Sequence, residues 1–295
     1  MKPGNSKAIF DFLDFLVAKK NENNVTSYIS IKNALYSFSI PFAFIVISKG
    51  TPLFRLRVHD KFTENLEEVL FYEIKEIGHR YDNNRITCFG RANEPLQSIF
   101  YCSTERELAF FETSQLSRGK EEKLGEIYTT GKWILQEDIK VATFPINEIN
   151  RSKNEIAEKL NKRFEELVNE LKEEGTDELL KVLDLISLEF AREYNGNSNN
   201  YLISAAFSNY IYDHIVINMN TGEEMNVDGI IYPSVQWTKN GMNLALKPEL
   251  IKNKILLLDQ VVCQKSELTG KKNYMETDTI ISKSIDYNNW KIIWK

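Results

Sequence analysis

The sequence has few of the residues from which metal centres, disulfide frameworks and catalytic triads are built. Its 295 residues include only three cysteines and three histidines: Cys88, Cys102, Cys263, His59, His79 and His214. The cysteines are odd in number and match no zinc-ligand spacing, so we predict no metal site and no disulfide. We see no signal peptide and expect a reduced, cytoplasmic setting. Cys102 is interpreted as a packing residue rather than a nucleophile.

Long apolar runs and an excess of basic charge are also missing. No segment reaches the about 18 apolar residues of a membrane span, and Phe38–Ser48, which contains Pro41, is interpreted as a buried strand. The net charge of −5 argues against a nucleic-acid binder, so we expect no nucleic-acid and no membrane partner. There is no Walker loop and no GxGxxG, so no resident dinucleotide cofactor is predicted.

Helical and strand patterns are both present, and they predict an α+β fold. We expect three helices in the middle of the chain and three strands after them: Ser152–Glu174, Asp177–Tyr194, Tyr201–Ile215, Gly229–Trp237, Asn243–Lys247 and Lys254–Cys263. An earlier strand is predicted at Gly131–Ala142. One mixed core fits better than two independent domains. We divide the chain into an N-terminal helical extension (1–50), a core (51–270) with a helical insert (150–195), and a tail (271–295).

The segment Gly90–Glu112 (GRANEPLQSIFYCSTERELAFFE) carries an arginine, a tyrosine and a glutamate at fixed offsets. Thr104 is the predicted N-cap of a helix, with Glu107 completing a capping box. The helical spacing then places Glu112 on the side of Leu108, at the margin of the core. A carboxylate on an apolar face is costly unless it is paired, although an exposed position at the edge of the stripe is the alternative.

Two other segments have alternative interpretations. Arg55 and Arg57 share one face of a predicted strand, where they face either solvent or a phosphate. The segment Ile9–Leu16 predicts a short amphipathic helix. That helix either packs on the rest of the chain or contacts a partner or a second copy.

The ordered set of these motifs resembles the RES family, which consists of NAD⁺-consuming bacterial toxins with an ADP-ribosyltransferase-like fold. The likeness lies in LFRLR, ending at Arg57, in Gly90–Glu112, in the strand region from Gly131, and in Asp228–Pro248 (DGIIYPSVQWTKNGMNLALKP). It implies that the family's arginine, tyrosine and glutamate fall on Arg91, Tyr101 and Glu112. Its serine falls on Ser234, and its asparagine–leucine strand begins at Asn243.

The chemistry of these residue types suits cleavage of the nicotinamide–ribose bond. Glu112 would stabilise the developing cation on the ribose. Arg91, helped by Arg55 and Arg57, would bind the pyrophosphate. Tyr101 would stack on a ring or bind the ribose, and Ser234 and Asn243 would contact the substrate. Structural alternatives are an Arg91–Glu112 ion pair, a core tyrosine and a turn serine.

The resemblance therefore implies an enzyme that degrades NAD⁺ by phosphorolysis or hydrolysis and acts as a toxin or an antiphage defence effector. NAD⁺ would be a substrate rather than a cofactor, and inorganic phosphate a possible co-substrate. Alternatives are an ADP-ribosyltransferase with a protein target and a non-catalytic binding module. The resemblance also implies an antitoxin in trans, and a homo-oligomer is a further possibility.

Overall fold

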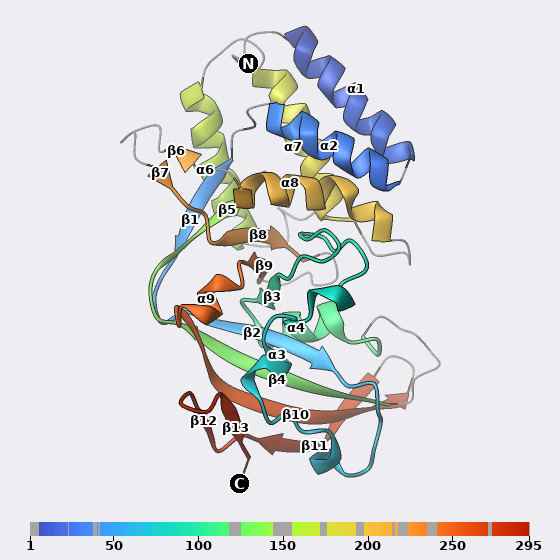
Figure 1. Cartoon of the computed structure of the whole chain (residues 1–295), viewed down its shortest axis with the longest axis vertical. Helices are drawn as coiled ribbons and strands as arrows, with labels where there is room; N and C mark the ends of the chain where they lie inside the picture. Colours follow the sequence, from blue (N-terminus) through green and yellow to red (C-terminus); the bar gives the residue numbers. More distant parts are fainter. Residues whose placement is uncertain are drawn as a thin grey trace. The chain divides into compact units, whose positions relative to one another are not determined.

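The computed structural model describes residues 6–22, 24–37, 40, 42–117, 125–143, 155–171, 176–192, 198–213, 216–217, 224–234, 241–270 and 273–294. Helices and strands both make up large parts of the described chain, which confirms the predicted α+β class (Figure 1). The chain forms two compact units, each built from three segments. Unit 1 contains Met1–Val46, Asp82–Ile99 and Lys140–Asn240, and unit 2 contains Ile47–Tyr81, Phe100–Ile139 and Gly241–Lys295. These units do not test the division along the chain at residues 50 and 270.

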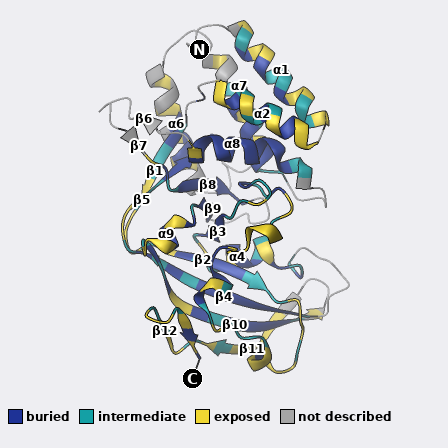
Figure 2. Ribbon diagram, viewed as in Figure 1, coloured by how far each residue is buried: buried dark blue, intermediate teal, exposed yellow. Residues whose placement is uncertain are grey.

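Unit 1 is mainly helical. Its longer helices are α1 (Ser6–Glu22), α2 (Val25–Ser37), α6 (Glu155–Leu171), α7 (Thr176–Phe190) and α8 (Leu202–Asp213). Every residue of α8 from Leu202 to Tyr212 is buried, and α1, α2 and α7 all pack on it (Figure 2). A helix that is buried on all sides forms the centre of its unit. The predicted helices at 152–174, 177–194 and 201–215 are confirmed within the described residues.

The amphipathic segment at the N-terminus belongs to α1, which is longer than predicted. Ile9, Phe12 and Leu16 are buried, and α1 packs on α2 and α7. Of the two interpretations of Ile9–Leu16, the structure therefore supports packing within the chain. The helix continues beyond Leu16 and ends at Glu22.

Unit 1 also contains short strands. They are β6 (Val216–Ile217), β7 (Glu224–Met225) and β8 (Gly229–Pro233), together with all but one terminal residue of β1 (Ala43–Ile47) and of β5 (Ile139–Thr143). β5 runs parallel to β8, with Val141 opposite Gly229. Within the strand predicted at 38–48, residues 38, 39 and 41 lie outside the described residues, and β1 spans Ala43–Ile47. The expected burial is wrong in part, because Val46 is 51% exposed. The predicted strand 131–142 is two strands, since β4 of unit 2 ends at Leu135 and a turn precedes β5.

Unit 2 is an antiparallel sheet. Its strand order is β9 (Met242–Leu246), β3 (Phe100–Ser103), β2 (Pro52–Val58), β4 (Gly125–Leu135), β10 (Leu256–Gly270) and β11 (Asn273–Ile281). The hairpin β12 (Ser284–Asp286) and β13 (Lys291–Ile293) and the short helices α3 (Ile74–Ile77), α4 (Arg106–Thr113) and α9 (Glu249–Lys252) complete the unit. The segment predicted as a tail from residue 271 therefore contains three strands.

The strand register defines two faces of this sheet, because residues directly opposite each other in an antiparallel pair point to the same side. Phe54 pairs with Ser103, and Ser103 pairs with Asn243. We call this side the helix face, since α4 covers it through a cluster of Leu56, Ala109, Phe110 and Tyr128. The opposite side, which carries Arg55, Arg57, Phe100 and Trp133, is called the arginine face.

Gly131 on β4 provides a test of the packing on the arginine face. A Cβ at this position would lie 2.9 Å from Trp133 Nε1, 3.0 Å from Ile77 Cγ1 and 3.0 Å from Leu258 Cδ1, all on buried side chains. We expect Gly131→Ala to lower the free energy of unfolding by about 1–3 kcal/mol through overpacking. Urea denaturation followed by tryptophan fluorescence measures the change. As a control, Ser284→Ala on the exposed start of β12 should stay within about 0.5 kcal/mol of wild type. Equal stabilities of the wild type and the Gly131 variant would contradict this packing.

Candidate active site

Glu112 lies near the end of α4, on the side of the helix that meets the sheet. Leu108 and Ala109 of the same helix are buried, and Glu112 is half-buried, at the margin of the core. This confirms the position expected from helical spacing. A half-buried carboxylate is partly desolvated and is still within reach of a ligand from solvent.

The Glu112 carboxylate is bound by the side chain of Asn243 on β9. Asn243 Nδ2 donates to Glu112 Oε1 at 2.9 Å, and Ser103 Oγ donates to Asn243 Oδ1 at 2.7 Å. Asn243 and Ser103 are buried and directly opposite each other in the sheet. Because each end of the carboxamide has a defined partner, its orientation is fixed and one carboxylate oxygen is held in place. Ser103 was not predicted, although it lies two residues after Tyr101 on the same face of β3.

The start of α4 is attached to β9 by two hydrogen bonds between Thr104 and Met242, which the sequence did not predict. The predicted capping by Thr104 is wrong, because the N-cap residue is Glu105 and it makes no side-chain capping bond. Instead, Thr104 N donates to Met242 O and Met242 N donates to Thr104 Oγ1, both at 2.9 Å. Gly241 precedes β9 with φ +133°, and a Cβ there would lie 3.1 Å from Glu105 Cγ and Leu108 Cδ2. These contacts bring Asn243 and Glu112 together.

Tyr101 is on the helix face of β3, on the same side as Ser103 and Asn243. Its side chain is half-buried, whereas its neighbours Phe100 and Cys102 are buried and point to the other face. Burial raises the pKa of the Cys102 thiol, so this cysteine is not a thiolate nucleophile, as predicted. The structure thus groups three predicted residues, Tyr101, Glu112 and Asn243, on one face of unit 2.

Arg55 and Arg57 lie on the arginine face, on the other side of the same sheet. Arg55 Nη1 donates to Tyr101 O at 2.7 Å, its guanidinium carbon lies 5.1 Å from the Phe100 ring centroid, and Arg57 Nη2 donates to Gly78 O at 2.8 Å. Burial, and then repulsion from Arg57 and Arg80, lowers the pKa of Arg55 to about 9, so the side chain is still charged at neutral pH. The structure therefore separates both arginines from Glu112.

The Arg55 guanidinium is a buried cation whose charge is not compensated by the described residues. It is 9% exposed, its Nε has no hydrogen-bond partner, and neither it nor Arg57 forms an ion pair within the described part of the chain. Burial of an unpaired charge is unfavourable, so an anion at this face would be stabilised. His79 and Arg80 extend this group of basic residues and were not predicted, since nothing in their spacing marks them.

Arg91 and Ser234 belong to unit 1. The Arg91 guanidinium donates to the backbone carbonyl of Phe190 and, at 3.0 Å, to that of Arg192, just beyond the end of α7. Its central carbon lies 5.4 Å from the Tyr201 ring centroid and 5.7 Å from that of Tyr232. Ser234 is buried directly after β8, two residues beyond Tyr232. The substrate-binding roles of Arg91 and Ser234 stay predictions.

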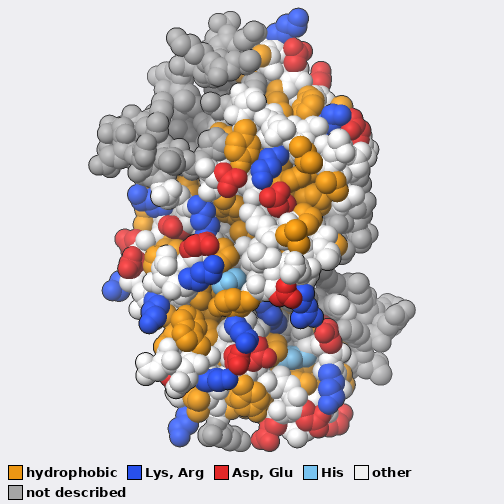
Figure 3. All heavy atoms as spheres, in the orientation of Figure 1, with side chains coloured by type: hydrophobic (Ala, Val, Ile, Leu, Met, Phe, Trp, Pro, Cys, Tyr) orange, Lys and Arg blue, Asp and Glu red, His pale blue; other side chains and the backbone are white. Residues whose placement is uncertain are grey.

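The surface shown in Figure 3 mixes charges of both signs. Lysine and arginine side chains alternate with aspartate and glutamate over the visible face (Figure 3). Within the residues that the structure describes, no group of three or more His, Cys, Asp or Glu side chains is arranged to hold a metal ion. None of the described helices has the length and hydropathy needed to cross a membrane.

His79 should make stability depend on pH. Burial, and then repulsion from Lys252, Arg55 and Arg57, lowers the pKa of His79 from 6.5 to about 4. The unfolded chain binds this proton at a higher pH than the folded chain does. The contribution of neutral His79 to the free energy of unfolding is therefore fully present above pH 6.5 and is lost as the pH falls toward 4. The loss amounts to about 3 kcal/mol over this range. Denaturation of wild type and His79→Gln at several pH values measures it, and parallel profiles of the two proteins would refute this assignment.

Comparison with protein-family models identifies the family to which the chain belongs. The model of the RES domain matches residues 53–259, which include every site residue considered above. No curated protein and no solved structure matches the chain. The matched range begins on β2 with the strand of Arg55 and ends within β10, after the strand that carries Asn243. The chain therefore belongs to the RES-domain family.

Proposed function

We propose that this protein cleaves the nicotinamide–ribose bond of NAD⁺, with Glu112 as the catalytic carboxylate. The observation that carries the proposal is the bond from Asn243 to Glu112 on the helix face, in a chain that belongs to the RES family. Members of that family are expected to consume NAD⁺. A fixed, half-buried carboxylate is the group that departure of nicotinamide requires.

Departure of nicotinamide leaves positive charge on the ribose, which a nearby carboxylate stabilises electrostatically. Asn243 holds one oxygen of Glu112, so the carboxylate does not have to reorient while charge develops. This preorganisation is effective because the side chain is partly shielded from water.

Tyr101 supports a position for the substrate on the helix face. Its half-buried ring lies on the same side of β3 as Ser103, and therefore as Asn243. A tyrosine ring offers a stacking surface for nicotinamide, and its hydroxyl can bind the ribose. In this proposal Tyr101 positions the reacting half of NAD⁺ beside Glu112.

The pyrophosphate needs cationic groups, and the arginines are the candidates. Arg55 is an uncompensated buried cation, and Arg91 has a planar fork of donors suited to phosphate oxygens. Arg55 also donates a hydrogen bond to the carbonyl of Tyr101. From the arginine face it therefore helps to hold β3, the strand that carries Tyr101 on the helix face. We propose Arg91 and Ser234 as direct contacts to the substrate, and Arg55 and Arg57 as support or as a second anion contact.

In this proposal the acceptor is phosphate or water, and the protein depletes NAD⁺ as a toxin or defence effector. An inhibitory protein acting in trans would then be expected, because free activity would harm the host cell. Transfer of ADP-ribose to a protein and simple nucleotide binding are the competing possibilities. Both would use the same site, but transfer yields an ADP-ribosylated protein, whereas simple binding leaves NAD⁺ intact.

The first test is an NAD⁺ turnover assay on the full chain, with and without inorganic phosphate, beside Glu112→Gln. We expect release of nicotinamide by wild type and a loss of about 10²–10³-fold in kcat for the variant, because one electrostatic contact to the transition state is removed. Mass spectrometry of the products then identifies the acceptor. Phosphorylated ADP-ribose indicates phosphorolysis, and free ADP-ribose indicates hydrolysis.

Glu107→Gln is the matched control, since Glu107 is an exposed glutamate on the same helix. Its turnover should equal that of wild type. Equal activity of Glu112→Gln and wild type would rule out the catalytic role of Glu112. Intact NAD⁺ in every sample would rule out turnover by the isolated chain and favour the binding module.

A further inference from the structure

The turn that carries Arg91 is held by backbone bonds and by a second short turn after it. Gly90 N donates to Asn93 O at 3.0 Å, which closes the Arg91 turn (Gly90–Asn93). Glu94 N then donates to Gln97 Oε1 at 3.0 Å, and Leu96 N donates to Ile86 O at 2.8 Å. Loops of this kind keep one conformation only when neighbouring elements support them.

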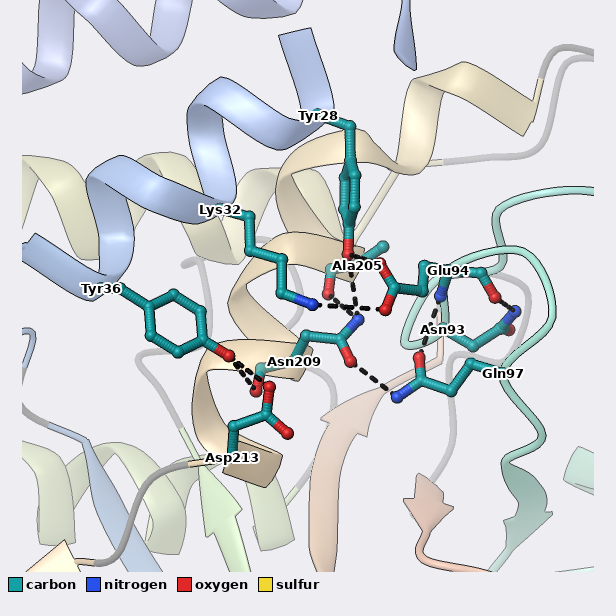
Figure 4. A network of polar contacts seen from close by, with 9 residues as sticks. All are labelled: Tyr28, Lys32, Tyr36, Asn93, Glu94, Gln97, Ala205, Asn209 and Asp213. Carbon is teal, nitrogen blue, oxygen red and sulfur yellow. Dashed lines mark hydrogen bonds and ion pairs between the residues drawn. The ribbon is translucent and has the colours of Figure 1, made fainter. Parts of the chain in front are cut away.

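Helix α2 of the N-terminal extension provides such support through Glu94. Tyr28 hydroxyl donates to Glu94 Oε2 at 2.6 Å, and Lys32 Nζ donates to Glu94 Oε1 at 3.2 Å (Figure 4). Tyr28 and Lys32 are four residues apart, so they share one face of α2. Both oxygens of the residue next to the Arg91 turn are therefore held by the same helix.

The same contacts continue into α8, the buried centre of unit 1. Asn209 Nδ2 donates to Tyr28 hydroxyl at 3.2 Å, and Gln97 Nε2 donates to Asn209 Oδ1 at 2.6 Å (Figure 4). Tyr28 and Asn209 are 4% and 2% exposed. Burial, and then the bond to Glu94, raises the pKa of Tyr28, so its hydroxyl stays a donor. A buried network with paired members is rigid, because breaking one bond leaves a polar group unsatisfied.

The guanidinium end of Arg91 is connected to the extension by a second route. Its acceptors, the carbonyls of Phe190 and Arg192, flank the end of α7. Next to them, the buried Glu189 accepts from Lys20 Nζ of α1 at 2.5 Å and from Arg192 at 3.1 Å. Helix α2 thus contacts Glu94, the residue next to the Arg91 turn, and α1 contacts the end of α7 that receives the Arg91 side chain.

We propose that the helix pair α1–α2 is a positioning element for Arg91, and that Glu94 is the positioning residue through which α2 acts. The functional part of this inference rests on the proposed cleavage of NAD⁺, in which Arg91 binds the pyrophosphate. The extension is then part of the substrate-binding apparatus, although it lies outside the residues matched by the family model.

The test compares Tyr28→Phe with Tyr36→Phe in the full chain. Both variants remove one hydroxyl from α2, and Tyr36 bonds to Asp213 and to Asn209 O rather than to Glu94. Hydrogen exchange of the amides at residues 90–97 should become about tenfold faster in Tyr28→Phe and stay unchanged in Tyr36→Phe, because only the first loses a bond to Glu94. This measurement needs no substrate, so it remains decisive if NAD⁺ cleavage itself fails.

Kinetics then separate positioning from a general loss of folded protein. We expect Tyr28→Phe to raise the KM for NAD⁺ about tenfold with little change in kcat, since a displaced arginine weakens substrate binding. Loss of folded protein would instead lower kcat and leave KM unchanged. Glu94→Gln, which keeps an oxygen acceptor for Tyr28, should retain more affinity for NAD⁺ than Glu94→Ala does.

Three results would overturn the proposal. They are unchanged exchange at residues 90–97 in Tyr28→Phe, equal effects of Tyr28→Phe and Tyr36→Phe, and faster exchange with an unchanged KM. If wild type releases no nicotinamide, the proposed function fails, and the exchange data alone decide whether α2 holds the Arg91 turn.

Discussion

The hydrogen bond from Asn243 to Glu112 determines how unit 2 presents the Glu112 carboxylate. Asn243 is buried and fixed at both ends of its carboxamide, by Ser103 on the neighbouring strand and by Glu112 on α4. If the helix moved away, this amide would lose a partner while still shielded from water, which is unfavourable. The pairing of β3 with β9, the docking of Thr104 on Met242 and the close approach at Gly241 all maintain this contact.

Charge is distributed unevenly between the two faces of the same sheet. The helix face carries the carboxylate, and the arginine face carries Arg55 and Arg57, of which Arg55 is buried without a counter-charge among the described residues. Such a cation lowers stability unless another group compensates it. Arg55 donates a hydrogen bond to the Tyr101 carbonyl on β3, the strand of the candidate site. The buried charge that lowers stability therefore also helps to hold that strand.

Local patterns predicted much of this arrangement. Helical spacing placed Glu112 at the core margin, and strand alternation put Arg55 and Arg57 on a common face, because both depend on neighbours within a few residues. The capping role of Thr104 failed because a distant strand offers its hydroxyl a better partner. Arg91 and its partners at the end of α7 are about 100 residues apart in the sequence, so no local pattern predicts their contacts. The prediction that the chain belongs to the RES family rested on the order of several weak motifs rather than on any one of them.

The most direct test of the account is a double-mutant cycle on the kcat/KM for NAD⁺ cleavage. The four proteins are wild type, Asn243→Ala, Glu112→Gln and the double variant. If Asn243 acts by holding Glu112, the double variant should be no more than about twofold less active than Glu112→Gln alone. Losses that multiply would mean that the two residues act independently, and the central claim would be contradicted.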